Sequence, residues 1–161
     1  MINFELLAQH EAAHAVMRWI LWLPATEILI NDKGGGICKG TGKRISVDKD
    51  VLVSLAGPAW EAGCCFTDSI DLDSPLHFQD LIEAKAVIDK CVHLRMLVDG
   101  NKMIEKSTRE SLQTWLKRAG ELLFRHADAV ESIGASLEHK KRLSAKTVAA
   151  FLREHGKRIP R

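Results

Sequence analysis

The segment that most restricts the fold lies at the start of the sequence. From Phe4 to Trp22 good helix formers follow one another without a glycine or a proline, and Pro24 forbids continuation of a helix. Residues 4–22 are therefore expected to form one long helix. Alanines at positions 12, 13 and 15 leave room for close neighbours, so other elements are expected to pack against it.

This expected helix contains His10-Glu11-Ala12-Ala13-His14, which matches the pattern H-E-x-x-H. Residues four apart lie on one face of a helix, so both imidazoles can reach a single Zn²⁺ ion. Glu11 is placed to hydrogen-bond a metal-bound water rather than to ligate the metal. Zinc lowers the pKa of such a water toward ~7, and the hydroxide formed after proton transfer to the glutamate attacks a peptide carbonyl. The sequence thus predicts His10 and His14 as metal ligands and Glu11 as the catalytic residue, which then passes its proton to the leaving amine.

A third ligand has to come from further along the chain. A catalytic zinc keeps three protein ligands and one open position. No third histidine follows in the form H-E-x-x-H-x-x-G-x-x-H, because Met17, Ile20 and Leu21 occupy that stretch. Spacing alone does not rank the downstream candidates, which are Glu61, His77, Asp80 and Glu83.

The rest of the chain predicts a mainly α fold with one small β-hairpin or sheet. Residues 26–30 alternate as a strand does, residues 31–36 are turn-forming, and residues 37–41 can return as a second strand. Helical patterns cover residues 51–65, 77–97 and 127–137, with Asp99-Gly100-Asn101 as a break. A capping box at Ser107-x-x-Glu110 and a cap at Ser144 start two further helices.

Several of these segments resemble a known family in order and approximate spacing. The run HEAAHAV at 10–16, the hairpin, the segment LAGPAWE at 55–61 and Gln79-Asp80-Leu81 look like the peptidase domain of FtsH, a family of membrane-anchored AAA+ zinc proteases. That family shows HEAGHA, then a helix with G-G-R-x-A-E-E, then N-D-[LI] at the start of a long helix. The resemblance implies a helical, zincin-like peptidase domain over 1–161, with a metal-site region at 1–100 and a C-terminal helical region at 101–161.

The resemblance also implies roles for two residues. It makes Asp80 the third zinc ligand and Glu61 the partner of a ligating histidine. The chain departs from the family pattern at Ala13, at Pro58, at Ala62 and in the segment before Asp80, where His77 stays a rival ligand.

These observations predict a zinc metalloendopeptidase that hydrolyses peptide bonds in unfolded or flexible polypeptide segments. There is no phosphate-binding loop and no apolar run long enough to span a membrane, so a free-standing peptidase domain is expected. An extended substrate is expected to pair with a strand edge, at residues 37–41 or 26–30. A homo-oligomer is left open. The alternative is a non-catalytic zinc-binding interaction module; the intact Glu11 favours the enzyme.

Charge and cysteine content bear on partners and compartment. The first 100 residues carry 9 basic and 14 acidic side chains, whereas residues 101–161 carry 14 basic and 7 acidic ones. No nucleic-acid motif accompanies the basic part, so no nucleic acid is expected as a partner. The four cysteines form no C-x-x-C pair, and acidic Glu5 precedes the apolar stretch where a signal peptide would be basic. A cytoplasmic protein with free thiols is expected.

Overall fold

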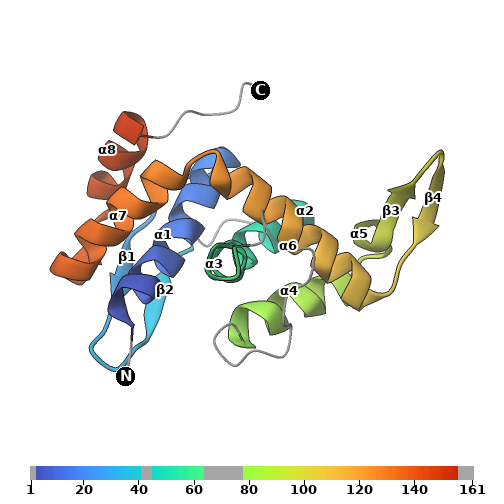
Figure 1. Cartoon of the computed structure of the whole chain (residues 1–161), viewed down its shortest axis with the longest axis horizontal. Coiled ribbons are helices and arrows are strands. Elements are labelled where there is room, and N and C mark those ends of the chain that lie inside the picture. Colours follow the sequence, from blue (N-terminus) through green and yellow to red (C-terminus); the bar gives the residue numbers. More distant parts are fainter. Residues whose placement is uncertain (1–2, 41–44, 64–77, 156–161) are drawn as a thin grey trace.

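A computed structural model describes residues 3–40, 45–63 and 78–155, and within them the fold is mainly helical (Figure 1). This agrees with the predicted mainly α class, whereas the described residues form two small antiparallel sheets in place of the single one expected. The helices are α1 (Phe4–Ile20), α2 (Val47–Ser54), α3 (Ala56–Glu61), α4 (Phe78–Lys90), α5 (Val92–Arg95), α6 (Thr108–Phe124), α7 (Ala127–Lys140) and α8 (Ala145–His155). The strands are β1 (Ile28–Ile30), β2 (Gly36–Cys38), β3 (Met96–Asp99), β4 (Lys102–Glu105) and β5 (Arg142–Leu143). None of the helices in these ranges is long and apolar enough to cross a membrane.

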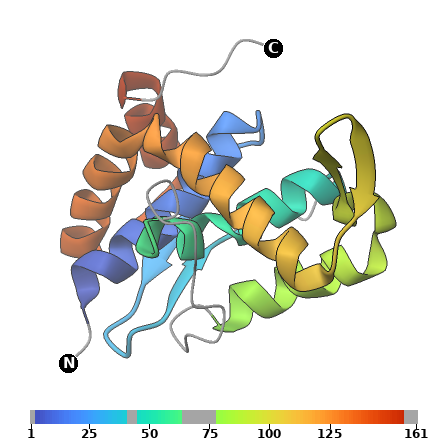
Figure 2. The ribbon, with the colours of Figure 1, turned by 45° about the vertical axis from the view of Figure 1, so that its right-hand side comes forward.

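Helix α1 is the centre of the core. From Ala8 to Ile20 all of its residues except Gln9 and Trp19 are buried, because α3, α7 and the β1–β2 hairpin contact it from different sides (Figure 2). The side chain of Asn3 accepts a hydrogen bond from the amide of Leu6 and so caps the start of the helix, at 3.0 Å. The helix ends two residues earlier than predicted.

A three-stranded antiparallel sheet lies beside α1, in the order β2-β1-β5. Ile28 pairs with Cys38 and Ile30 with Gly36, and on the other side Ile28 pairs with Leu143. Strand β1 is therefore covered on both sides, and residues 26–30 are wrong as the free edge expected for substrate. The described part of the other candidate, β2, does lie at an edge of this sheet.

The predicted helix over residues 51–65 begins earlier and is interrupted. Helix α2 starts at Val47, and Leu55 ends it and begins α3. Pro58 explains the break, since it has no amide hydrogen to donate to the carbonyl of Ser54, four residues back. Residues 64 and 65 lie outside the described part.

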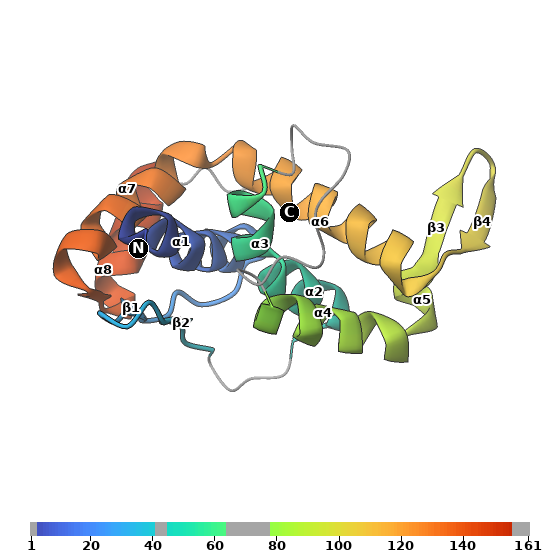
Figure 3. The same ribbon diagram turned by 60° about the horizontal axis from the view of Figure 1, so that its bottom comes forward.

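The predicted helix over residues 77–97 also differs from the structure. It ends at Lys90, a single turn follows as α5, and the chain then forms the β3–β4 hairpin. Gly100 has φ +61°, which suits a two-residue hairpin turn with glycine in first position. Figures 1 and 3 show this hairpin extending from the end of the molecule opposite α7 and α8.

Both predicted helix caps in the C-terminal region are confirmed. Ser107 Oγ accepts from the amide of Glu110 at 3.3 Å, and the Glu110 carboxylate accepts from the amide of Ser107 at 3.0 Å. Ser144 Oγ accepts from the amide of Thr147 at 3.2 Å. The apolar face of α6 is buried, with the exception of the partly buried Leu122.

Candidate metal centre

Two helices bring three ligand atoms to one point. His10 and His14 stand on α1, and Asp80 stands in the first turn of α4. The two histidine Nε2 atoms are 3.1 Å apart. Asp80 Oδ2 lies 3.0 Å from Nε2 of His10 and 3.7 Å from Nε2 of His14. In a tetrahedral site with zinc–ligand bonds of about 2.1 Å, neighbouring ligand atoms are about 3.4 Å apart, so this spacing fits one ion.

The opposite nitrogen of each imidazole fixes which way its lone pair points. His14 Nδ1 lies 2.7 Å from the carbonyl oxygen of Val53, which can only accept, so Nδ1 carries the hydrogen. His10 Nδ1 lies 2.8 Å from Oε1 of Glu61, a carboxylate oxygen that accepts the hydrogen of this nitrogen. In a neutral ring the hydrogen is then at Nδ1, and Nε2 carries a lone pair. The two Nε2 atoms and the Asp80 carboxylate oxygen converge on the same point. Three electron-rich atoms stay this close only around a cation, either a metal ion or a proton.

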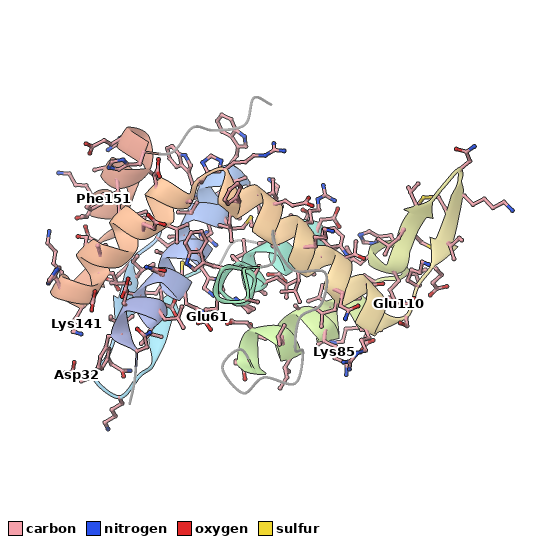
Figure 4. All side chains as sticks on the ribbon, in the orientation of Figure 1. Asp32, Glu61, Lys85, Glu110, Lys141 and Phe151 are labelled. Carbon is pink, nitrogen blue, oxygen red and sulfur yellow. The ribbon has the colours of Figure 1, made fainter. Side chains whose placement is uncertain are left out.

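Glu61 comes from α3, which lies between α1 and α4 (Figure 4). Its carboxylate contacts Nδ1 of His10, the ring nitrogen on the side away from His14 and Asp80. Glu61 therefore contacts His10 and is not one of the three residues whose ligand atoms converge.

The pKa values reflect the same arrangement. Burial opposes a charge on His10, but its hydrogen bonds to Asp80 and Glu61 outweigh this and raise the pKa of His10 to about 9. Burial acts to raise the pKa of Asp80, yet hydrogen bonds to the two histidines hold it well below its usual range. At neutral pH, a metal ion entering the site therefore has to displace a proton from the His10–Asp80 pair.

The side chain of Glu11 extends from α1 toward strand β2. Only 6% of it is exposed, and burial raises its pKa, with the two histidine charges opposing the rise. A Cβ atom at Gly36 would overlap the Glu11 carboxylate and would come within 2.6 Å of Glu11 Cγ. The absence of a side chain at position 36 is what lets β2 pass this close to the carboxylate.

Gly57 plays a comparable part on the other side of the site. A Cβ atom there would overlap the imidazole of His10, so the backbone of α3 packs directly on that ring. The sequence indicated no role for Gly57, and it indicated only a turn for Gly36. The carbonyl of Val53 was also missed, and no side-chain pattern could have indicated a backbone acceptor.

A cavity of about 320 Å³ opens beside these residues. Its lining includes Glu11, His14 and Asp80 as well as the residues of strand β2. Glu83, one of the candidate ligands, also borders the cavity, but its carboxylate accepts from Gln79 at 2.8 Å and is not brought to the histidines. His77 lies outside the described residues.

Comparison with known proteins does not assign the chain to a family. The sequence matches no protein-family model, and none of the curated proteins compared with it matches significantly. The resemblance to the FtsH peptidase domain therefore stays a prediction based on the motifs given above.

Proposed function

We propose that this protein is a zinc-dependent metallopeptidase that hydrolyses peptide bonds in unfolded or flexible polypeptide segments. The convergence of His10, His14 and Asp80 beside a cavity that Glu11 also borders is the observation that carries the proposal. Two imidazoles and one carboxylate form a ligand set typical of catalytic zinc, in which a fourth position stays open. The zincin-like nature of the fold and the kinship with FtsH are parts of the same proposal.

The residues around the ligands would prepare the site for the ion. Glu61 and the Val53 carbonyl hold one hydrogen of each imidazole at Nδ1, so that both Nε2 atoms are free to bind a metal once the proton shared by His10 and Asp80 has been displaced. When bound, zinc polarises a substrate carbonyl and lowers the pKa of water. Asp80 adds a negative charge, and its low pKa keeps it ionised over the whole neutral range.

Glu11 would act as the general base and then as the general acid. Glu11 follows His10 directly in α1 and borders the cavity where the substrate carbonyl would lie. Because burial raises its pKa, it takes up a proton from the attacking water more readily than an exposed glutamate does. The same proton can then pass to the amine of the leaving peptide, so that the carboxylate is regenerated.

Strand β2 would bind the main chain of the substrate. It borders the cavity, and in the described residues β1 is the only strand that pairs with it. An extended peptide can add to such an edge through backbone hydrogen bonds, with little dependence on side chains. A folded substrate would have to lose its own structure to pair in this way, which is why the proposal specifies unfolded or flexible segments.

The test combines metal analysis with a peptidase assay. Purified, untagged wild-type protein is expected to hold about one zinc ion per chain, and Asp80→Asn is expected to lose most of it. Asp128→Asn, an exposed change on α7, is the matched control and should keep the wild-type zinc content. Zinc fully retained in Asp80→Asn would refute the ligand assignment.

The assay uses denatured casein as an unfolded substrate. Glu11→Gln is expected to keep its zinc and to lose at least about a hundredfold in rate, because it cannot accept a proton. Equal rates for wild type and Glu11→Gln, with zinc present in both, would refute the enzyme and favour the non-catalytic binding module.

A further inference from the structure

Arg18 is a charged residue of the cavity that the proposed mechanism does not use. It borders the same cavity as Glu11 and His14. These three residues are spaced by three and four along α1, which places them in one row on the helix surface. The rise of 1.5 Å per residue puts Arg18 about 6 Å along the helix from His14.

The guanidinium of Arg18 is buried and lacks an acidic partner. Only 5% of the residue is exposed. Nε donates to the carbonyl oxygen of Pro24 at 3.3 Å, but Nη2 is buried with no hydrogen-bond partner, and no carboxylate of the described residues forms an ion pair with this side chain. A buried charge without a partner is unfavourable. The hydrogen bond to Pro24 accounts for one donor of the guanidinium and leaves Nη2 without a partner.

The other charged residues that border the cavity are either exposed or part of the proposed metal centre. Asp50 and Glu83 border it as well, but both are exposed, so water screens them more strongly. Asp80 and Glu11 belong to the metal centre. Among the described residues Arg18 is therefore the buried positive charge of the cavity wall outside that centre.

We infer that Arg18 binds a carboxylate of the peptide substrate and so sets a preference for an anionic group close to the scissile bond. This inference rests on the proposed peptidase function. Arginine stays protonated at every physiological pH and presents parallel N–H donors that match the two oxygens of a carboxylate. The separation of about 6 Å from His14 corresponds to one or two residues of extended peptide. The carboxylate is either the C-terminus of the substrate or an Asp or Glu side chain.

Binding of matched peptides tests this inference without turnover. The probes are dansyl-Ala-Leu-Ala-Leu-Ala with a free C-terminal carboxylate, the same peptide as its amide, and the amide with Glu as its last residue. They are titrated into zinc-treated Glu11→Gln protein, with dansyl fluorescence as the readout. At least one of the two anionic peptides is expected to bind about ten- to a hundredfold more tightly than the neutral amide. Which of them does so identifies the source of the carboxylate.

The same titrations on arginine variants locate the effect. Arg18→Gln should remove the preference for the anionic peptide, and Arg18→Lys should keep part of it, because lysine retains the charge but not the paired donors. Arg153→Gln on α8 carries the same loss of charge at an exposed position and should leave the preference unchanged. Thermal melts show whether each variant is folded.

Two results would overturn the inference. One is equal affinity of all three peptides for protein with Arg18 intact, a comparison that needs no variant at position 18. The other is a preference that persists in folded Arg18→Gln. Zinc content and casein hydrolysis are measured separately, so a protein that prefers the anionic peptide but lacks zinc would refute the peptidase proposal alone. A zinc-containing, active protein without the preference would refute the role of Arg18 alone.

Discussion

At the scale of single residues, the proposed metal centre would depend on the groups that hold the ligands as much as on the ligands themselves. His10 is placed between Asp80 on one nitrogen and Glu61 on the other. The second contact keeps a hydrogen at Nδ1, so that Nε2 is the nitrogen left for a metal ion once its proton has been displaced. A zinc site built in this way loses affinity when the outer carboxylate is removed, even though all three ligands remain.

Glu61→Leu is therefore expected to weaken zinc binding about ten- to a hundredfold. The change leaves His10 Nδ1 without its acceptor, so that the ring is no longer held in the metal-binding form. The dissociation constant is measured by competition with a chelator of known affinity. Glu83→Leu removes a carboxylate that borders the same cavity but contacts Gln79 instead, and its zinc affinity should match that of the wild type. Equal losses in the two variants would show that Glu61 has no special part.

Zinc affinity should also rise with pH. The pKa of His10 is raised to about 9, so below that pH the metal-free site holds a proton that zinc has to displace. The logarithm of the association constant is then expected to increase by about one for each pH unit up to pH 9 and to level off above it. Asp80 adds no second step near neutral pH, because its pKa is lowered. Titrations in a series of buffers measure the slope, and an affinity independent of pH between 6 and 9 would contradict the proton held by His10.

At the scale of elements, the position of strand β2 against helix α1 decides where Glu11 points. Gly36→Ala is expected to keep zinc, since no ligand is touched, and to lower peptidase activity, since the added Cβ would overlap the Glu11 carboxylate. Gly40→Ala is the matched control, because it also borders the cavity but a Cβ there meets no atom within 4 Å. Zinc analysis and casein hydrolysis on both variants measure the effect. Full activity of Gly36→Ala would show that the strand can shift without moving the base.

The elements also show how far sequence alone could lead. Helix α1 and its histidine face followed from residue periodicity and from Pro24, because these depend on neighbours in the chain. One helix was predicted to run through Pro58, where the structure has a break, and another to run up to the predicted break at 99–101, where the structure has a hairpin turn. Strand β5 could not be found, because two residues become a strand only through their pairing with β1, more than a hundred residues earlier.

The candidate site likewise contains residues that a local sequence pattern can predict and residues that it cannot. His10, Glu11 and His14 are close in sequence, so a local pattern was enough to group them. Asp80 was selected only through a resemblance, since nothing local distinguishes it from Glu83, one turn later on the same helix. The contacts of Gly36 and of the Val53 carbonyl depend on how separate elements meet, and this is not encoded in any short stretch of sequence.

At the scale of the whole molecule, a bound zinc ion would join α1 to α4 and so connect segments about seventy residues apart in the chain. A ligand that binds only the folded state stabilises it by mass action. Zinc at a hundredfold excess over its dissociation constant should raise the melting temperature by about 5–10 °C relative to protein in a chelator. Glu11→Gln should show the whole shift, whereas Asp80→Asn, which lacks a ligand, should show little of it. Calorimetry with and without a chelator measures both.

The size of this shift should itself depend on pH, with a sign fixed by His10. In the metal-free protein the folded-state pKa of about 9 lies above the ordinary value of 6.5, so its contribution to stability is complete below pH 6.5 and is lost as pH rises through 9. Asp80 has a lowered pKa and acts in the opposite range, because its contribution is present above 3.8 and is lost only in acid. Zinc replaces the proton between the ligands, so the zinc-bound protein should not weaken between pH 6.5 and 9. The melting temperatures of the two forms should therefore diverge toward alkaline pH, and parallel curves would mean that the ligands do not share one cation.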